Sequence, residues 1–562
     1  MRYLSSRPSI NNRMQEILVN FGFQPPLPKT PDAKRSTQQK GTENILKIII
    51  ILTTLFLISL PCSASPKSSS PNIVLIIADD VSAEDVGCYG CPGIKTPVMD
   101  RLAATGIRFD NGFVTTATCA ASRGSIMLGR WPHCTAMPEL KAIYRPEIKE
   151  IETFVERLDS MVKSLHENGY YTIQRGKWHI GGAYPFNNPK GIFSKSFDTV
   201  KAGNPRLGGE EDWVSALQQR PKNKPFFCWF ASYDAHRKFT APKVHLESDV
   251  KVPPYMPDLS LKKGYRSRAD LAKYYDEINR LDTSIGNVVK ELKAQEVYEN
   301  TIIVIIADNG RPFVRSKLYT YDSGMRVPFI IHWKGGIKQA GTVSKSLVST
   351  IDLAPTFLEA AGITIEGTTF QGRSLIPLLQ EDSSTPNHPF IVTERNHHIW
   401  EAHERAIRTA EFLYIRNRRP EIQRRGADWA DDSSMWHLRK ELNGAPMPQE
   451  YTYFFTPALP EELFNVKKDP HQLKNIIENK ENEPVLQKMR TYLSEWEKQT
   501  RDTAPKKLTR HIWNDKKWGY PKDKKAFNPE SNKLGDQPGW NHLKNSSDEQ
   551  LREEAAYSRK NF

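Results

Sequence analysis

The chain has 562 residues, of which 38% are hydrophobic and 26% charged, and this is enough for a large core and more than one domain. Its formal net charge is +14, but residues 501–562 hold 14 basic and 9 acidic side chains, and residues 1–43 hold 7 and 3. Because the middle of the chain is only mildly basic, we do not infer nucleic-acid binding. A polyanionic substrate is an adequate explanation of the high pI.

An apolar run near the N-terminus indicates export. Ile48–Leu60 follows two lysines and precedes the small residues Cys62 to Ser65. This layout is typical of a signal peptide over residues 44–64, cleaved near Ala64, and the run is short for a membrane span. We expect a periplasmic or secreted protein with an N-terminal extension over residues 1–43. A retained signal anchor is the alternative.

Six cysteines occur in the chain, and Cys88 and Cys91 have the spacing Cys-x-x-Cys. No second pair stands at zinc-ribbon spacing, so we do not expect a zinc site there. An exported protein can form disulfides, but the sequence does not assign the partners.

Two buried strands are predicted to end in pairs of oxygen ligands. Asn72–Ala78 is a continuous apolar run followed by Asp79-Asp80, and Thr301–Ala307 is another, followed by Asp308-Asn309. Open α/β sheets bind ligands at the carboxyl ends of strands, and adjacent carboxylates repel each other unless a cation holds them. Hard oxygen donors without His or Cys favour calcium, with magnesium as the alternative, over zinc. A solvated turn is the other interpretation of the first pair.

The stretch from Cys119 to Arg130 reads as a reactive residue in a loop, followed by a short helix. Ile107–Val114 is a probable strand before it, Ser122 and Arg123 fall in the first helical turn, and Gly129 ends the helix. A helix N-terminus carries unpaired N–H groups that favour an anion, and Arg123 adds a fork of donors. We interpret the stretch as a nucleophile aimed into an anion site. A buried structural cysteine is the alternative.

A second basic motif follows the predicted strand Tyr170–Gln174. Lys177 and His179, two residues apart at a strand end, project the same way and suit one bound anion. A surface loop anchored by Trp178 is the alternative.

The remaining pattern alternates strands and helices up to about residue 385. Apolar stripes and buried runs predict helices that begin at Thr96-Pro97 and span Ile151–His166, Arg266–Gln295 and Leu353–Ala361, and strands over Pro225–Tyr233 and Phe329–Trp333. Shorter runs then predict a smaller antiparallel sheet: Phe390–Thr393, Ala406–Thr409 and Phe412–Arg416. Residues from about 501 lack clear periodicity, and we interpret them as a partly ordered extension.

Five blocks in order resemble the formylglycine-dependent sulfatases of the alkaline-phosphatase superfamily. They are Asp79-Asp80, Cys119-Ala120-Ala121-Ser122-Arg123 with Gly129-Arg130, Gly176-Lys177-Trp178-His179-Ile180-Gly181, Asp308-Asn309, and Lys317 to Pro328. Ala121 stands where the family usually has Pro, and Ser323 stands where it has Gly. The resemblance covers residues 71 to 495.

The resemblance implies an α/β fold with a large mixed, mostly parallel sheet sandwiched by helices, and a smaller C-terminal antiparallel sheet domain. We accordingly expect a catalytic domain over residues 71–385, a C-terminal subdomain over 386–500 and a basic extension over 501–562.

The resemblance also implies the chemistry. A maturase would convert Cys119 to formylglycine, whose hydrated aldehyde is the nucleophile. The ligands of the cation would be Asp79, Asp80, Cys119, Asp308 and Asn309. Arg123, Lys177 and Lys317 would stabilise charge on the sulfate, and His179 would be the base for sulfate release. His236, alone or with Lys317, would protonate the leaving group. It follows the strand Pro225–Tyr233 as in the family, although Arg237 stands where Pro is often found.

Two classes of sulfated carbohydrate are candidate substrates. Asp308-Asn309-Gly310-x-Pro312-Phe313 resembles the sulfamidase (heparan N-sulfatase) branch, which implies an N-sulfated glucosamine. An O-sulfated sugar is the alternative, and a phosphomonoester is a minor one. A catalytically inactive polyanion-binding protein is the hypothesis from another class, against which the complete set of four oxygen ligands argues.

Overall fold

The computed structural model describes residues 70–135, 153–180, 192–380, 387–396, 398, 402–422, 433–452, 459–504 and 540–562. All of them belong to one compact unit, Ser69–Phe562. Across these ranges, no helix has the length and apolar character needed to cross a bilayer. The predicted signal segment lies outside the described residues.

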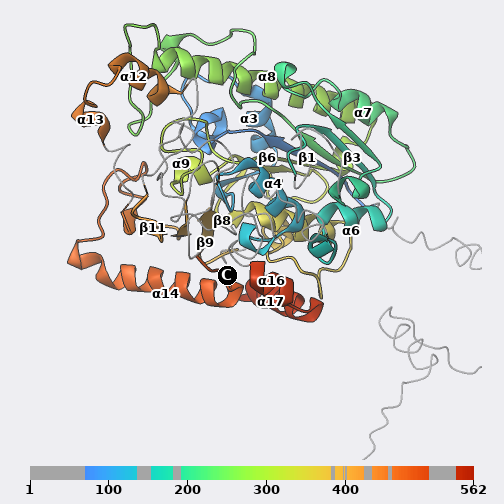
Figure 1. The fold of residues 1–562 in the computed structure, drawn as a ribbon. Helices are drawn as coiled ribbons and strands as arrows, with labels where there is room; N and C mark the ends of the chain where they lie inside the picture. Colours follow the sequence, from blue (N-terminus) through green and yellow to red (C-terminus); the bar gives the residue numbers. More distant parts are fainter. Residues whose placement is uncertain are drawn as a thin grey trace, which may run out of the picture. The chain divides into compact units, whose positions relative to one another are not determined.

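A large mixed sheet forms the centre of this unit (Figure 1). Its eight strands have the order β4-β3-β5-β1-β6-β7-β2-β8, and only the pairs that β7 makes with β6 and β2 are antiparallel. The strands are β1 (Asn72–Ala78), β2 (Ile107–Phe113), β3 (Tyr171–Gly176), β4 (Thr199–Ala202), β5 (Phe226–Ala231), β6 (Thr301–Ala307), β7 (Phe329–His332) and β8 (Thr342–Ser349). The predicted mixed, mostly parallel sheet is confirmed.

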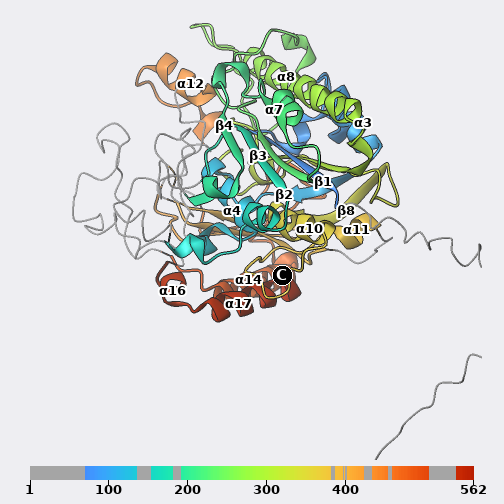
Figure 2. The ribbon, with the colours of Figure 1, turned by 90° about the vertical axis from the view of Figure 1, so that its right-hand side faces the viewer.

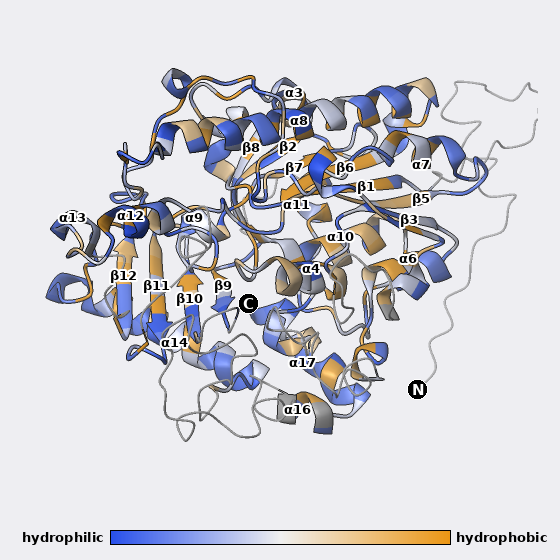
Figure 3. Ribbon diagram, turned by 45° about the horizontal axis from the view of Figure 1, so that its top comes forward, coloured by the Kyte–Doolittle hydropathy of each residue, from blue (hydrophilic) through white to orange (hydrophobic). Residues whose placement is uncertain are grey.

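Helices cover both faces of this sheet (Figures 1 and 2). One face packs against α3 (Pro97–Ala104), α7 (Trp213–Gln219) and α8 (Ser267–Ala294), and the other against α4 (Cys119–Leu128), α6 (Met161–Glu167), α10 (Leu353–Ala360) and α11 (Ile376–Gln380). Side chains alternate along β1, so Ile73, Leu75 and Ile77 enter one core and Val74 and Ile76 the other. Figure 3 shows the contrast between hydrophobic β1 and the hydrophilic residues along much of α8.

A second sheet of four antiparallel strands has the order β12-β11-β10-β9. Its strands are β9 (Ile391–Arg395), β10 (Glu404–Arg408), β11 (Phe412–Asn417) and β12 (Glu461–Asn465), which confirms the predicted smaller sheet. Helix α14 (Glu483–Thr500) packs Leu493 and Trp496 into a core shared with Ile407 of β10. The other helices are α9 (Asp322–Met325), α12 (Ser434–Leu442), α13 (Gln449–Thr452), α16 (Trp540–Asn545) and α17 (Asp548–Asn561).

One prediction about a helix was wrong in detail. The stripe in 151–166 does not form one helix, because Asp159 leaves the helical path to exchange two hydrogen bonds with Thr369, and α6 begins afterwards at Met161. Helix α3 begins at Pro97, directly after Thr96, as predicted, and the Thr96 side chain makes no capping hydrogen bond. Its hydroxyl accepts from the Gly87 N–H at 2.9 Å and donates to Asp100 at 3.1 Å.

The C-terminal helices α16 and α17 lie beside α14 (Figure 1). Leu543 and Leu551 enter the core of the large sheet, and Phe562 enters the core that α14 shares with the small sheet. Residues 540–562 therefore pack against both sheets.

Candidate active site

The two predicted pairs of oxygen ligands lie side by side. Strands β1 and β6 are parallel neighbours whose last residues, Ala78 and Ala307, are paired, so the residues that follow emerge at the same sheet edge. The Asp80 N–H donates to Asp308 Oδ1 at 3.2 Å, and Asn309 Nδ2 donates to Asp80 Oδ1 at 2.7 Å. All four side chains are fully buried.

Cys119 completes this cluster from the start of α4. Its Sγ lies 3.7 Å from Asp79 Oδ1 and 3.8 Å from Asp80 Oδ1. One ligand atom from each of Asp79, Asp80, Cys119 and Asp308 lies within 4.8 Å of the others. The buried Asn309 Oδ1 has no hydrogen-bond partner in the structure. These oxygen atoms fit a hard divalent cation, which would offset the repulsion between the buried carboxylates.

Three cationic side chains pair one to one with the three carboxylates. Lys177 Nζ contacts Asp79 Oδ2, Lys317 Nζ lies 2.5 Å from Asp80 Oδ1, and Arg123 Nη2 lies 2.7 Å from Asp308 Oδ2. Burial acts to raise the pKa of Asp79, but the charges of Lys177, His236 and Arg123 outweigh it, and the pKa lies below its usual value. Asp79 is therefore ionised at neutral pH.

Helix α4 orients Cys119 and Arg123 toward the same point. The prediction that Cys119 precedes the helix was wrong, because it is the first helical residue, with extended Thr118 before it. Arg123 follows one turn later and so lies on the same face. Gly129, in the left-handed conformation with φ 56°, ends the helix as predicted. Burial raises the pKa of the Cys119 thiol to about 12, so the unmodified side chain is a neutral thiol.

Both predicted histidines stand at this edge. Burial and the charges of Lys177, Arg123 and Lys317 hold the pKa of His179 well below its usual value, so the ring is neutral. His236 Nε2 lies 4.0 Å from Asp80 Oδ2, and its Nδ1 lies 2.5 Å from the backbone oxygen of Arg237. Desolvation by the surrounding groups and the charge of Lys317 lower the pKa of His236 as well, although its side chain is 44% exposed.

Helix α8 supplies a supporting residue that the sequence analysis missed. The Tyr274 hydroxyl lies within hydrogen-bonding distance of two acceptors, the Asp80 backbone oxygen at 3.0 Å and Asp85 Oδ2 at 2.9 Å. It thereby holds the end of β1, where the backbone of Asp80 has φ 61°. Tyr274 falls within the predicted helix Arg266–Gln295, but nothing in the sequence distinguishes it from the other residues of that helix.

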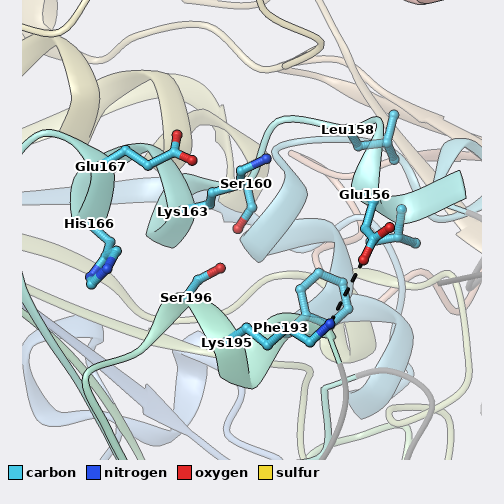
Figure 4. A pocket seen from close by; sticks show the side chains of 10 residues that line it. Glu156, Leu158, Ser160, Lys163, His166, Glu167, Phe193, Lys195 and Ser196 are labelled. Atoms are coloured by element: carbon cyan, nitrogen blue, oxygen red, sulfur yellow. Dashed lines mark ion pairs between the residues drawn. The ribbon is translucent and has the colours of Figure 1, made fainter. Parts of the chain in front are cut away.

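A cavity of about 360 Å³ lies away from these residues, between α6 and the short 3-10 helix Ile192–Ser196 (Figure 4). Lys195 Nζ is 4.0 Å from Glu156 Oε1 across it, and Ser160 and His166 also line it. None of the predicted site residues lines this cavity, so we place the reaction at the edge formed by β1, β3, β5, β6 and α4.

Comparison with known proteins agrees with this geometry. The chain is 28% identical over 448 residues to an ulvan-active sulfatase of Formosa agariphila, an alignment that covers 77% of this chain and 81% of that one. It is 25% identical over 492 residues to human N-sulphoglucosamine sulphohydrolase, covering 78% and 92%.

Solved structures share the fold. BT4656, in complex with its substrate D-glucosamine-2-N,6-O-disulfate, superposes with a TM-score of 0.57 at 20% identity, covering 76% of this chain and 98% of that one. The phosphonate monoester hydrolase of Agrobacterium radiobacter gives 0.55 at 16% identity, covering 75% and 95%.

Family models match two overlapping regions. The C-terminal model of N-sulphoglucosamine sulphohydrolase matches residues 314–420. The sulfatase model matches residues 71–363, which is more than half of the chain. The chain therefore belongs to the sulfatase family, enzymes that hydrolyse sulfate esters or sulfamates.

Proposed function

We propose that this sulfatase removes sulfate from a sulfated sugar at the cluster around Cys119. The observation that carries the proposal is the placement of Asp79, Asp80, Cys119 and Asp308 within 4.8 Å of one another, with Arg123, Lys177 and Lys317 in contact with the carboxylates. This arrangement joins a cation site to a set of anion donors at one point, which a sulfate group requires.

The proposed cofactors are a divalent cation and formylglycine at position 119. Asp79, Asp80, Asp308 and Asn309 would hold the cation, for which their hard oxygens favour Ca²⁺, with Mg²⁺ as the alternative. The cation supplies positive charge that eases ionisation of a hydroxyl and neutralises sulfate oxygens. Formylglycine, made from Cys119 by a maturase, supplies a hydrated aldehyde with one hydroxyl for attack and a second for release.

The chain's own side chains bind the sulfate and move protons. Arg123 Nη1 has no hydrogen-bond partner in the structure, although it is buried, and it is available for a sulfate oxygen. Lys177 and Lys317 would contribute the other donors. Neutral His179 would accept a proton during sulfate release, and His236 would hold a proton at Nε2 for the leaving group.

We propose N-sulfated glucosamine as the first substrate to test. The match of residues 314–420 to the N-sulphoglucosamine sulphohydrolase model and the human relative of that name support it. The ulvan-active relative supports a second candidate, a sugar of another sulfated polysaccharide. Export after cleavage near Ala64 would bring the enzyme to such substrates, and N-terminal sequencing of the protein recovered outside the cytoplasm tests this step.

Sulfate release from protein produced together with a maturase tests the proposal. Peptide mass spectrometry first measures formylglycine at position 119. Ion chromatography then measures sulfate released from glucosamine N-sulfate, glucosamine 6-sulfate and 4-nitrophenyl sulfate, with Cys119→Ala as the inactive control. Release that depends on residue 119 supports the proposal. Complete conversion at position 119 without release from any sulfated compound overturns it, and binding of sulfated glycans without turnover would favour the polyanion-binding alternative.

A further inference from the structure

We propose that Arg237 and Asp270 are positioning residues that aim His236 at the leaving group. The inference rests on the proposed function, because it takes His236 as the proton donor. Arg237 stands where the family often has Pro, and none of the steps above uses it. Its side chain is mostly buried and contacts Asp270, Phe239 and Phe313.

Asp270, on α8, holds the Arg237 guanidinium through two parallel contacts. Nη1 lies 3.0 Å from Asp270 Oδ1, and Nη2 lies 2.5 Å from Asp270 Oδ2. The side chains are only 14% and 12% exposed. Tyr265 donates its hydroxyl to Asp270 Oδ2 at 2.9 Å, which fixes the carboxylate. A bidentate pair of this kind constrains orientation as well as distance.

Two aromatic rings enclose the same guanidinium. Its central carbon lies 4.8 Å from the ring centroids of both Phe239 and Phe313, and Nε donates to the Pro312 backbone oxygen at 3.4 Å. Phe313 is 1% exposed, so this residue of the sulfamidase-like motif packs against Arg237 and does not face a substrate. The two ring centroids are 6.4 Å apart, and the planar guanidinium lies against both rings, a contact that a lysine ammonium does not reproduce.

The held side chain fixes the backbone that His236 uses. The Arg237 carbonyl oxygen lies 2.5 Å from His236 Nδ1 and accepts its hydrogen, so the second proton of the charged ring is held on Nε2, and the ring returns to the neutral tautomer with hydrogen on Nδ1 once that proton is donated. The opposite nitrogen, Nε2, is the one 4.0 Å from Asp80 Oδ2 at the cluster. If Arg237 loses its anchor, its carbonyl can turn, and both the tautomer and the direction of Nε2 become variable.

The test compares two leaving groups in Arg237→Lys and Asp270→Asn. A sugar leaving group needs a proton, whereas 4-nitrophenolate departs without one. We expect kcat for the sulfated sugar to fall about 10- to 100-fold, a partial loss that reaches the lower limit of the roughly 100- to 10,000-fold contribution of general acid catalysis, and kcat for 4-nitrophenyl sulfate to fall less than about 3-fold. KM changes little for either substrate. The control is Arg268→Lys, which leaves both rates unchanged, because Arg268 lies on the same helix as Asp270 and forms an exposed ion pair with Asp258.

A double-mutant cycle separates aiming of His236 from general support. His236→Asn alone produces the same preference for the nitrophenyl substrate, and adding Arg237→Lys to it lowers the sugar rate no further. Equal losses on both substrates, or no change on either, would overturn the inference. Formylglycine content and melting temperature are measured for each variant, so that incomplete maturation or unfolding is recognised.

NMR of the histidine ring nitrogens gives a readout that does not need turnover. In protein with labelled histidine, assigned through His236→Asn, we expect the tautomer with hydrogen on Nδ1 in the wild type and a mixture in Arg237→Lys. An unchanged tautomer in the variant would overturn the inference. If wild-type protein releases no sulfate, but the tautomer still changes between wild type and Arg237→Lys, only the proposed function is refuted.

Discussion

Replacement of Glu554 tests whether α17 stabilises the end of the helix that carries Cys119. Glu554 Oε1 lies 3.4 Å from Nη2 of Arg130, the residue that follows the end of α4 at Gly129. The same oxygen accepts from Gln371 Nε2 at 3.0 Å, and Oε2 lies 3.1 Å from His542 Nε2. The Arg130 side chain is fully buried and that of Glu554 is 9% exposed. Glu554→Ala therefore leaves a buried guanidinium without its carboxylate.

The expected loss of unfolding free energy depends on the hydrogen bonds that Arg130 keeps in the variant. Removal of one partner of a buried ion pair costs about 3–5 kcal/mol when no compensation is present. Arg130 Nε still donates to the Cys134 oxygen at 3.0 Å, and Nη1 still donates to the Thr369 oxygen. Because the lost contact is long and two others remain, we expect about 3 kcal/mol for Glu554→Ala and about 2 kcal/mol for Glu554→Gln, which retains an acceptor.

Thermal unfolding measures this effect. For a unit of this size, with about 2 cal/mol/K of unfolding entropy per residue, these values lower the melting temperature by about 2 to 3 °C. Glu553→Gln, the exposed neighbour on the same helix, is the matched control and leaves it unchanged. If Glu554→Ala melts at the control temperature, α17 does not stabilise the end of α4 and the reasoning is wrong.

Three further predictions concern the catalytic edge and a buried pair beside it. Chelation of divalent cations abolishes sulfate release and lowers the melting temperature, and Ca²⁺ restores both better than Mg²⁺; activity that survives exhaustive chelation contradicts the cation site. Arg123→Lys keeps the charge but loses the fork that binds Asp308, so kcat/KM falls about 100-fold, measured by sulfate release, and a loss below about 3-fold contradicts its role. Burial opposes the charge on His133, but Cys134 and Glu394 raise its pKa well above the usual value. The ion pair between His133 and Glu394, at 2.6 Å, therefore stabilises the fold fully below about pH 6.5 and less as the pH rises through the folded-state pKa of His133. Urea unfolding of His133→Gln therefore shows a larger loss of stability at pH 6 than at pH 9, and equal losses contradict the assignment.

The strand ends of the site could be predicted because their signals are local. The runs before Asp79-Asp80 and Asp308-Asn309 are apolar at every position, which is what a strand buried on both faces requires, and both form fully buried strands. The apolar stripe of α8 is likewise a local signal, because it depends only on residues along one helix. The predicted helix Arg266–Gln295 agrees with the observed Ser267–Ala294 to one residue at each end.

The features that sequence reasoning missed depend on partners far along the chain. Asp159 breaks a helical stripe because it binds Thr369, 210 residues away. Glu554 is one charged residue among many in a segment with weak periodicity, and only its distance to Arg130 distinguishes it. Arg237 reads as a departure from a family pattern, and its partner Asp270 reads as an ordinary helix residue. No spacing rule joins such pairs, because their proximity results from the packing of α8, α17 and the segment between α10 and α11 in the folded chain.

The one-to-one pairing of charges explains how a buried site stays ready for an anion. Three carboxylates and three cationic groups leave the cluster without net charge, which limits the cost of burying six ionised side chains. When the carboxylates instead serve a divalent cation, Arg123, Lys177 and Lys317 no longer need them as counter-charges, and their donors become available to sulfate oxygens. The net charge of the cluster would then be about two units positive, which suits an anionic group that binds beside buried charges. Affinity for sulfate and affinity for the cation are therefore linked, and each raises the other by the same factor.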